Sequence, residues 1–147
     1  LQRPENGILI SGGGRKRKKP QAICNLEFKK EDEEVYRTIG IGQRARRGRP
    51  MDFWGFLILD GQRIGYDLWL YRETGSVKIP CDRRELKQKL GENNLLTDSP
   101  GEYKKLVNQY IFGFRKLEQY DQFIRLLVKV RARSSQKNSG RPKCMIF

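Results

Sequence analysis

Three groups of positively charged side chains carry the chemistry that this sequence offers. Guanidinium and ammonium groups bind phosphate oxygens, so each group is a candidate phosphate contact. One is an uninterrupted block near the start, one lies in the string QRARRGRP, and one alternates with apolar residues late in the chain. The residues are Arg15, Lys16, Arg17, Lys18 and Lys19; Arg44, Arg46, Arg47 and Arg49; and Arg125, Lys129, Arg131 and Arg133.

The charge balance supports this interpretation. Lys and Arg number 31 against 17 Asp and Glu, so the 147-residue chain carries a formal net charge of +14. A compact chain with so much charge of one sign repels itself, and a polyanionic partner relieves that repulsion. Nucleic acid, either RNA or DNA, and an anionic membrane surface are the partners that this charge predicts.

The composition along the chain predicts one domain between two basic tails. Residues 1–20 are expected to form a flexible basic arm, because Ser11–Gly14 is glycine-rich and five adjacent cations cannot pack together. Within this arm, Gly7–Ile10 has the character of a short strand. Residues 21–133 are expected to form a single α+β domain, and residues 134–147 a disordered basic tail.

The centre of the expected domain is Met51–Tyr71, which holds both tryptophans. Asp60-Gly61 lies between two apolar runs, a pattern typical of a β-hairpin turn. Phe53–Leu59 is apolar at almost every position, as in a strand covered on both faces. The segment after the turn alternates apolar and polar residues. We therefore predict a central hairpin whose aromatic residues belong to the core or to a subunit interface.

Further strands and two helices follow from periodicity and from capping residues. Alternation predicts strands over Ala22–Phe28, Val35–Ile41 and Val77–Cys81, giving a mostly antiparallel sheet of about five to six strands. Asp82 and Gly91 delimit a short helix, Arg83–Leu90. Ser99, followed by Pro100 and by Glu102 three residues on, predicts a capping box and a long packed helix, Pro100–Leu117.

The second and third basic groups are expected on the sheet. Gly42–Pro50 is interpreted as a basic loop between strands, and its Arg47-Gly48-Arg49-Pro50 resembles the core of an AT-hook. That resemblance implies an extended segment in the minor groove of A·T-rich DNA. Gly40–Ala45 also fits GxGxxA, but no apolar helix follows, which argues against a dinucleotide site. Phe123–Arg133 alternates with period two and predicts a last strand with a cationic face.

Cysteine and carboxylate positions indicate neither a metal site nor a catalytic site. Cys24, Cys81 and Cys144 are far apart and the chain has no histidine, so we expect reduced thiols, no metal and no cofactor. Asp52, Asp60 and Asp67 are the carboxylates nearest the expected core, and they show no pairing pattern. Cys144–Phe147 has the C-a-a-X form with basic residues upstream, which makes Cys144 a possible lipidation site.

These observations favour a non-enzymatic, strongly basic nucleic-acid-binding structural protein of the viral nucleocapsid or capsid type. Its contacts would be to the phosphate backbone, with little base specificity. A peripheral membrane or viral matrix-type protein, anchored through Cys144, is the alternative, and a metal-dependent nuclease using Mg²⁺ is the second. The expected location is the nucleus, the cytoplasm or a virion interior rather than the secreted fraction, and homo-oligomerisation is possible.

Overall fold

The computed structural model describes the backbone of residues 9–10 and 20–135 and the side chains of residues 20–130. The chain divides into two compact units, Leu1–Tyr103 and Lys104–Phe147. Most of the two expected tails, residues 1–8, 11–19 and 136–147, lies outside the described residues.

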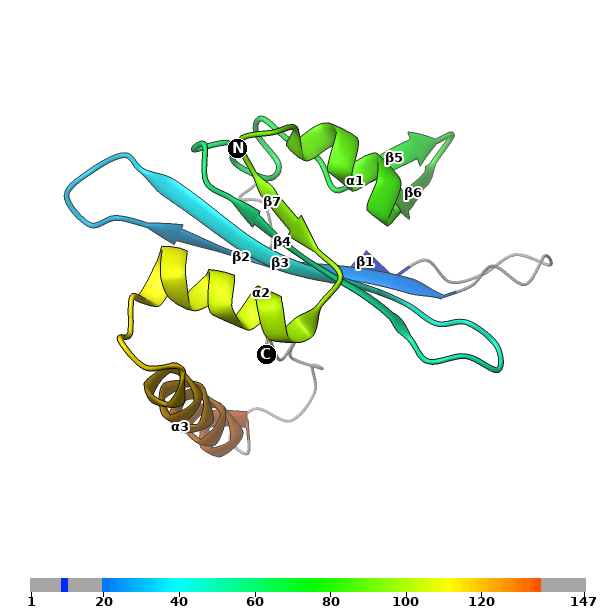
Figure 1. The fold of residues 1–147 in the computed structure, drawn as a ribbon. Coiled ribbons are helices and arrows are strands. Elements are labelled where there is room, and N and C mark those ends of the chain that lie inside the picture. The colour runs from blue at the N-terminus through cyan, green and yellow to red at the C-terminus, as the bar shows by residue number, and fades with distance from the viewer. Residues whose placement is uncertain (1–8, 11–19, 136–147) are drawn as a thin grey trace. The chain divides into compact units, whose positions relative to one another are not determined.

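The first unit contains an antiparallel sheet with the strand order β1-β2-β3-β4-β7 (Figure 1). Its members are the two-residue β1 (Leu9–Ile10) and the longer β2 (Gln21–Lys29), β3 (Tyr36–Arg44), β4 (Asp52–Ile58) and β7 (Leu95–Thr97). A separate ribbon pairs β5 (Tyr71–Thr74) with β6 (Val77–Pro80) and leads into helix α1 (Arg83–Leu90). The predicted α+β class is confirmed.

The predicted hairpin over Met51–Tyr71 is wrong in its second arm. The first arm is β4, whose residues Trp54–Ile58 are buried, but its second neighbour in the sheet is β7. Residues 59–70 form a loop with a single parallel bridge between Ile64 and Leu68. The reason is long-range pairing: β7 occupies the edge of β4 that a second hairpin arm would use, and just beyond the strand Asn94 Oδ1 accepts a hydrogen bond from the Leu59 N–H at 2.8 Å.

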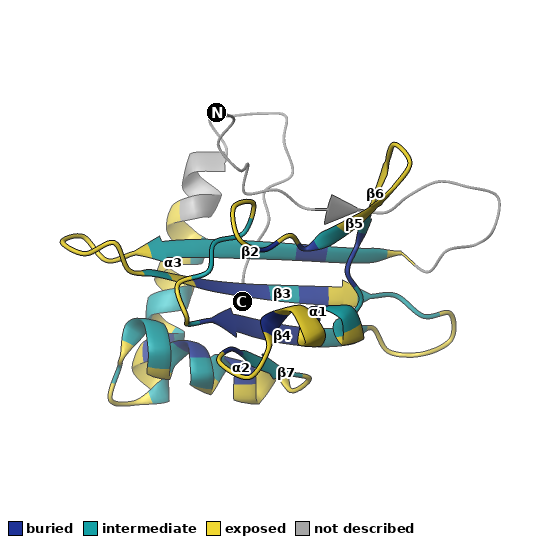
Figure 2. Ribbon diagram, turned by 90° about the horizontal axis from the view of Figure 1, so that it is seen from above, coloured by how far each residue is buried: buried dark blue, intermediate teal, exposed yellow. Residues whose placement is uncertain are grey.

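A cluster of buried apolar side chains covers one face of the sheet. Ile23 of β2 and alternate side chains of β4 meet residues of the loop, of the end of the ribbon and of α1. Figure 2 shows β4 buried along most of its length. The buried members are Ile23, Trp54, Phe56, Ile58, Leu68, Leu70, Cys81, Leu86 and Leu90. Helix α1 therefore contributes only its two inward leucines, while its remaining residues stay at the surface or at partial exposure.

Two glycines of β3 allow the core aromatics to lie flat on the sheet. Gly40 and Gly42 pair with Phe56 and Trp54 across the β3–β4 ladder. A Cβ atom on Gly40 would lie 2.1 Å from Phe56 Cζ, and one on Gly42 would lie 2.2 Å from Trp54 Cε2 and Nε1. The glycine pattern in Gly40–Ala45 is thus a packing requirement between two strands.

Both predicted helix starts are confirmed. The Asp82 carboxylate accepts a hydrogen bond from the Glu85 N–H at 2.9 Å, and α1 ends at Gly91 with φ 66°. Helix α2 (Pro100–Val107) begins with the Ser99 hydroxyl accepting from the Glu102 N–H at 3.3 Å. The Ser99 N–H donates to Thr97 Oγ1 at 3.2 Å. Thr97 therefore provides the acceptor that the Glu102 side chain would provide in a capping box.

The second unit begins within the α2 helix, which continues as a π-helical turn, η1 (Asn108–Phe112). This helical stretch ends at Gly113, with φ 69°, earlier than the predicted Leu117. Asn108 closes the end: its Nδ2 donates to the Phe114 carbonyl at 2.9 Å, and its Oδ1 accepts from the Phe114 N–H at 3.0 Å. Because the Asn108 side chain pairs with both the N–H and the carbonyl of Phe114, the helical stretch ends before this residue.

The predicted last strand, Phe123–Arg133, is wrong because the segment lies within helix α3 (Leu117–Ser135). Phe112 lies between the rings of Tyr120 and Phe123, with centroids at 5.7 and 5.3 Å. Residues three apart meet one partner only on a helix. The less exposed positions Leu117, Tyr120, Ile124 and Val128 likewise follow a three-to-four spacing.

We predict that Gly40→Ala and Gly42→Ala each lower the free energy of unfolding by about 3 kcal/mol, because Phe56 or Trp54 must leave its place to admit a methyl group. The midpoint of urea unfolding measures this. Gly101→Ala is the control, since its Cβ would meet nothing nearer than Ser99 Oγ at 3.9 Å. The control should gain up to about 1 kcal/mol, because Ala favours a helix more than Gly does. A loss of less than about 1 kcal/mol in both strand variants would contradict the packing argument.

Candidate nucleic-acid interface

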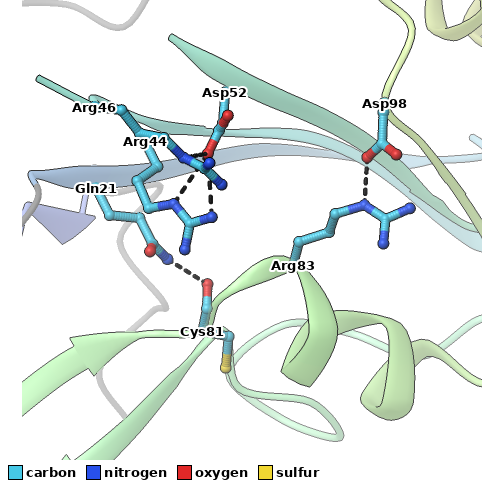
Figure 3. Close-up of polar contacts among 7 residues, drawn as sticks. All are labelled: Gln21, Arg44, Arg46, Asp52, Cys81, Arg83 and Asp98. Carbon is cyan, nitrogen blue, oxygen red and sulfur yellow. Dashed lines mark hydrogen bonds and ion pairs between the residues drawn. The ribbon is translucent and has the colours of Figure 1, made fainter. Parts of the chain in front are cut away.

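The turn between β3 and β4, residues 45–51, is called the basic turn below; it carries Arg46, Arg47 and Arg49 of the second basic group, and Arg44 directly precedes it. Arg44 ends β3 and Asp52 begins β4, and the two face each other in the ladder. Arg44 donates to Asp52 Oδ2 from Nε at 3.2 Å and from Nη2 at 3.1 Å, while Arg46 donates to the same oxygen from Nε at 2.6 Å (Figure 3). Both arginines are therefore held at the base of the turn.

Arg47 and Arg49 occupy the tip of the basic turn and differ from this pair. Both side chains are exposed, and neither has an ion-pair partner among the residues that the structure describes. Gly48, between them, has φ +71°, and the Arg49 N–H donates to the Arg46 carbonyl at 3.4 Å. Because this backbone is turned and not extended, Arg47–Pro50 does not have the conformation that its resemblance to an AT-hook implies.

Pro20 and Gln21, which follow the first basic group in the sequence, lie beside the basic turn. The Ala45 N–H donates to the Pro20 carbonyl at 2.9 Å, and Gln21 pairs with Arg44 in the β2–β3 ladder. The side chain of Gln21 also donates to the Cys81 carbonyl, which fixes this end of β2 (Figure 3). Arg15–Lys19 themselves lie outside the described residues, but they immediately precede Pro20 in the chain. The backbone that follows the first basic group is thus bound next to the basic turn.

The third basic group does not form the predicted stripe. Arg125 and Lys129 are exposed and lie one turn apart on helix α3. The stripe was expected because every second residue of a strand shares one face of a sheet, and this spacing does not hold on a helix. The side chains of Arg131 and Arg133 lie outside the described ones. Helix α3 belongs to the second unit, whereas the basic turn belongs to the first.

A cluster at the other end of the sheet could not be identified from sequence. Arg63, in the loop after β4, donates to both carboxylate oxygens of Glu27 at 2.8 and 3.1 Å. Its guanidinium group lies 4.1 Å from the centroid of the Tyr36 ring and 4.4 Å from that of Tyr66. Hydrogen bonds to Glu27 raise the pKa of the Arg63 guanidinium group above its ordinary value. This arrangement fixes the loop to the ends of β2 and β3.

The three carboxylates considered for a nuclease have different hydrogen-bond partners. Asp52 is at the start of β4, and Asp60 follows its end, where it accepts from Gln62 and Asn94. Asp67 accepts from the Arg63 N–H at 2.9 Å. A search of the described residues finds no group of three or more His, Cys, Asp or Glu that could hold a metal ion. Cys144 is outside the described residues, and burial raises the pKa of the Cys81 thiol.

Comparison with protein-family models, with curated proteins and with solved structures finds no match for this chain. Among the described residues, no helix combines the length and the apolar character needed to cross a bilayer.

The Asp52 contacts predict a measurable pH dependence. Partial burial raises the pKa of the Asp52 carboxyl, but hydrogen bonds and positive charge from Arg44 and Arg46 lower it more, so the pKa lies below 3.8. The ionised carboxylate therefore stabilises the turn above pH 3.8, and this contribution is lost as the pH falls through the lower folded-state pKa. An NMR titration of the Asp52 side chain should give a midpoint below 3.8.

Arg44→Gln combined with Arg46→Gln should move that midpoint upward, while Arg47→Gln should leave it nearly unchanged because Arg47 does not contact Asp52. An Asp52 midpoint at or above 3.8 in the unmodified chain would show that the two arginines do not hold the carboxylate in solution.

Proposed function

We propose that this chain is a non-enzymatic nucleic-acid-binding protein that uses the basic turn and the adjoining Arg15–Lys19 to contact phosphates. The observation that supports the proposal most directly is that two arginines bind Asp52 while two others stay exposed. Asp52 holds Arg44 and Arg46, and this leaves Arg47 and Arg49 exposed on a braced backbone. A braced turn loses less conformational entropy on binding than a free loop does.

The charges around the turn suit a polyanion. Four arginines and one aspartate give residues 44–52 a net charge of +3, from four positive and one negative side chain. Elsewhere in the first unit, Arg63 and Arg72 each pair with a glutamate, and Arg83 pairs with Asp98. Arg47 and Arg49 are exposed and have no ion-pair partner among the described residues, so they can make the paired hydrogen bonds that guanidinium groups make with phosphate.

The mode of binding follows from the chemistry of these contacts. Phosphates are the same at every nucleotide, so arginine contacts to them carry no sequence information. The structural role of the nucleocapsid or capsid type, which is part of the proposal, requires this kind of binding, because such a protein covers a whole nucleic acid. The Arg15–Lys19 block would extend the contact along the phosphate backbone from its junction at Pro20.

The test is the salt dependence of binding to a labelled single-stranded RNA and to a duplex DNA of equal length, measured by fluorescence anisotropy. Each phosphate contact contributes about 0.7 to 0.9 to the slope of log K against log salt concentration. Arg47→Gln combined with Arg49→Gln should therefore weaken binding at low salt and reduce that slope by roughly 1.4 to 1.8. Both side chains are exposed, so the fold should be retained.

The matched control is Arg84→Gln combined with Lys87→Gln, which removes the same charge from exposed positions of α1. It should leave the slope almost unchanged. Equal loss in the two double variants would show that overall charge, and not the basic turn, determines binding. Tighter binding to anionic vesicles than to either nucleic acid would contradict the proposal and favour lipid headgroups as the partner.

A further inference from the structure

The turn between β2 and β3, residues 30–35, is the charge opposite of the basic turn and is called the acidic turn below. Lys30 pairs with Glu33 at 2.6 Å, which neutralises one charge of each sign. Glu31, Asp32 and Glu34 are exposed and have no ion-pair partner among the side chains that the structure describes. The acidic turn therefore presents three carboxylates that have no ion-pair partner among the described side chains, with the exposed Lys29 and Arg37 on either side of the turn.

Both turns also carry exposed apolar side chains beside their charges. Val35, in the acidic turn, is 42% exposed, and Tyr66, whose ring contacts the same Arg63 guanidinium group as the Tyr36 ring, is 45% exposed. In the basic turn, Met51 is 58% exposed. An apolar centre with charges around it is the usual composition of a protein–protein contact.

The two turns of one molecule cannot meet. The β2–β3 ladder runs in register from Gln21 and Arg44 at one end to Lys29 and Tyr36 at the other. Nine residues of strand span roughly 25 to 30 Å, so the ladder separates the turns by about that distance. Figures 1 and 2 both show the two turns projecting from opposite ends of the sheet.

We propose that the acidic turn of one copy binds the basic turn of a second copy, so that molecules associate head to tail. In this contact Glu31, Asp32 and Glu34 pair with Arg47 and Arg49 of the neighbour, while Val35 and Tyr66 cover its Met51. The contact joins two different surfaces, so its repetition generates open chains of molecules, or a ring where the rotation between neighbours closes.

A second copy is the occupant that the charges favour. Nucleic acid and anionic lipid are repelled by the acidic turn, whereas a cationic surface with an exposed apolar side chain complements it. This chain presents such a surface at its basic turn. The inference does not depend on nucleic-acid binding and shares only Arg47 and Arg49 with it.

The experiment is charge reversal at each end, followed by mixing. Variant one, Arg47→Glu with Arg49→Glu, has acidic residues at both ends. Variant two, Glu31→Lys with Glu34→Lys, has basic residues in place of two of the free acids. Sedimentation velocity at low salt, on protein freed of nucleic acid by nuclease, measures how the weight-average mass depends on concentration.

The unmodified chain should increase in mass with concentration, and each variant alone should remain monomeric. An equimolar mixture should regain association, because variant one retains the acidic turn and variant two retains the basic turn. About 1 M salt, where the Debye length is about 3 Å, should dissociate the mixture and the unmodified chain.

Two control variants separate the turns from overall charge. Arg84→Glu with Lys87→Glu matches variant one in net charge, and Glu73→Lys with Glu92→Lys matches variant two, all at exposed positions away from both turns. Both controls should associate as the unmodified chain does. A monomeric unmodified chain, a mixture that stays monomeric, or association of either variant alone would overturn the proposal.

The outcome is separable from that for nucleic-acid binding. Variant two keeps Arg47 and Arg49, so it should bind RNA at least as tightly as the unmodified chain even though it no longer associates with itself. If variant one binds RNA normally, the proposed function fails, while the mixing experiment still decides the head-to-tail contact.

Discussion

The register between β2 and β3 is the constraint on which the rest of the first unit depends. Nine consecutive pairs fix which side chains share a face, because a slip of one residue would move every one of them to the other face. The same register places Ile23, Gly42 and Trp54 in one row of the core and fixes the separation of the two charged turns. Core packing and charge distribution are therefore set by one ladder of backbone hydrogen bonds.

Local signals in the sequence were sufficient where a structure is determined by neighbours in the chain. The caps of α1 and α2 were predictable because Asp82 and Ser99 act on N–H groups three residues away. The second arm of the hairpin was not, because Asn94, more than thirty residues on, binds the backbone at Leu59. The alternation in Phe123–Arg133 was misleading because aromatic contacts to Phe112, which a period count does not include, favour the helix.

The candidate site shows the same limit. The sequence locates the arginines at the basic turn but does not distinguish those that Asp52 holds from those left exposed. That distinction arises from the pairing of Arg44 with Asp52 in the ladder, which depends on the length of the turn. The contacts of Arg63 with Tyr36 and Tyr66 have no signal in the sequence, since Tyr36 begins β3 and the other two residues belong to a loop almost thirty residues further on.

The two proposals, taken together, give the basic turn two competing occupants. A second copy offers three carboxylates on a compact turn, whereas a nucleic acid offers an extended row of phosphates that can engage Arg15–Lys19 as well. Each added phosphate contact releases counterions, so at low salt the longer polyanion gains more free energy than a single acidic turn can supply. Nucleic acid would then displace the neighbouring copy, and head-to-tail chains would be the form that the protein adopts in its absence.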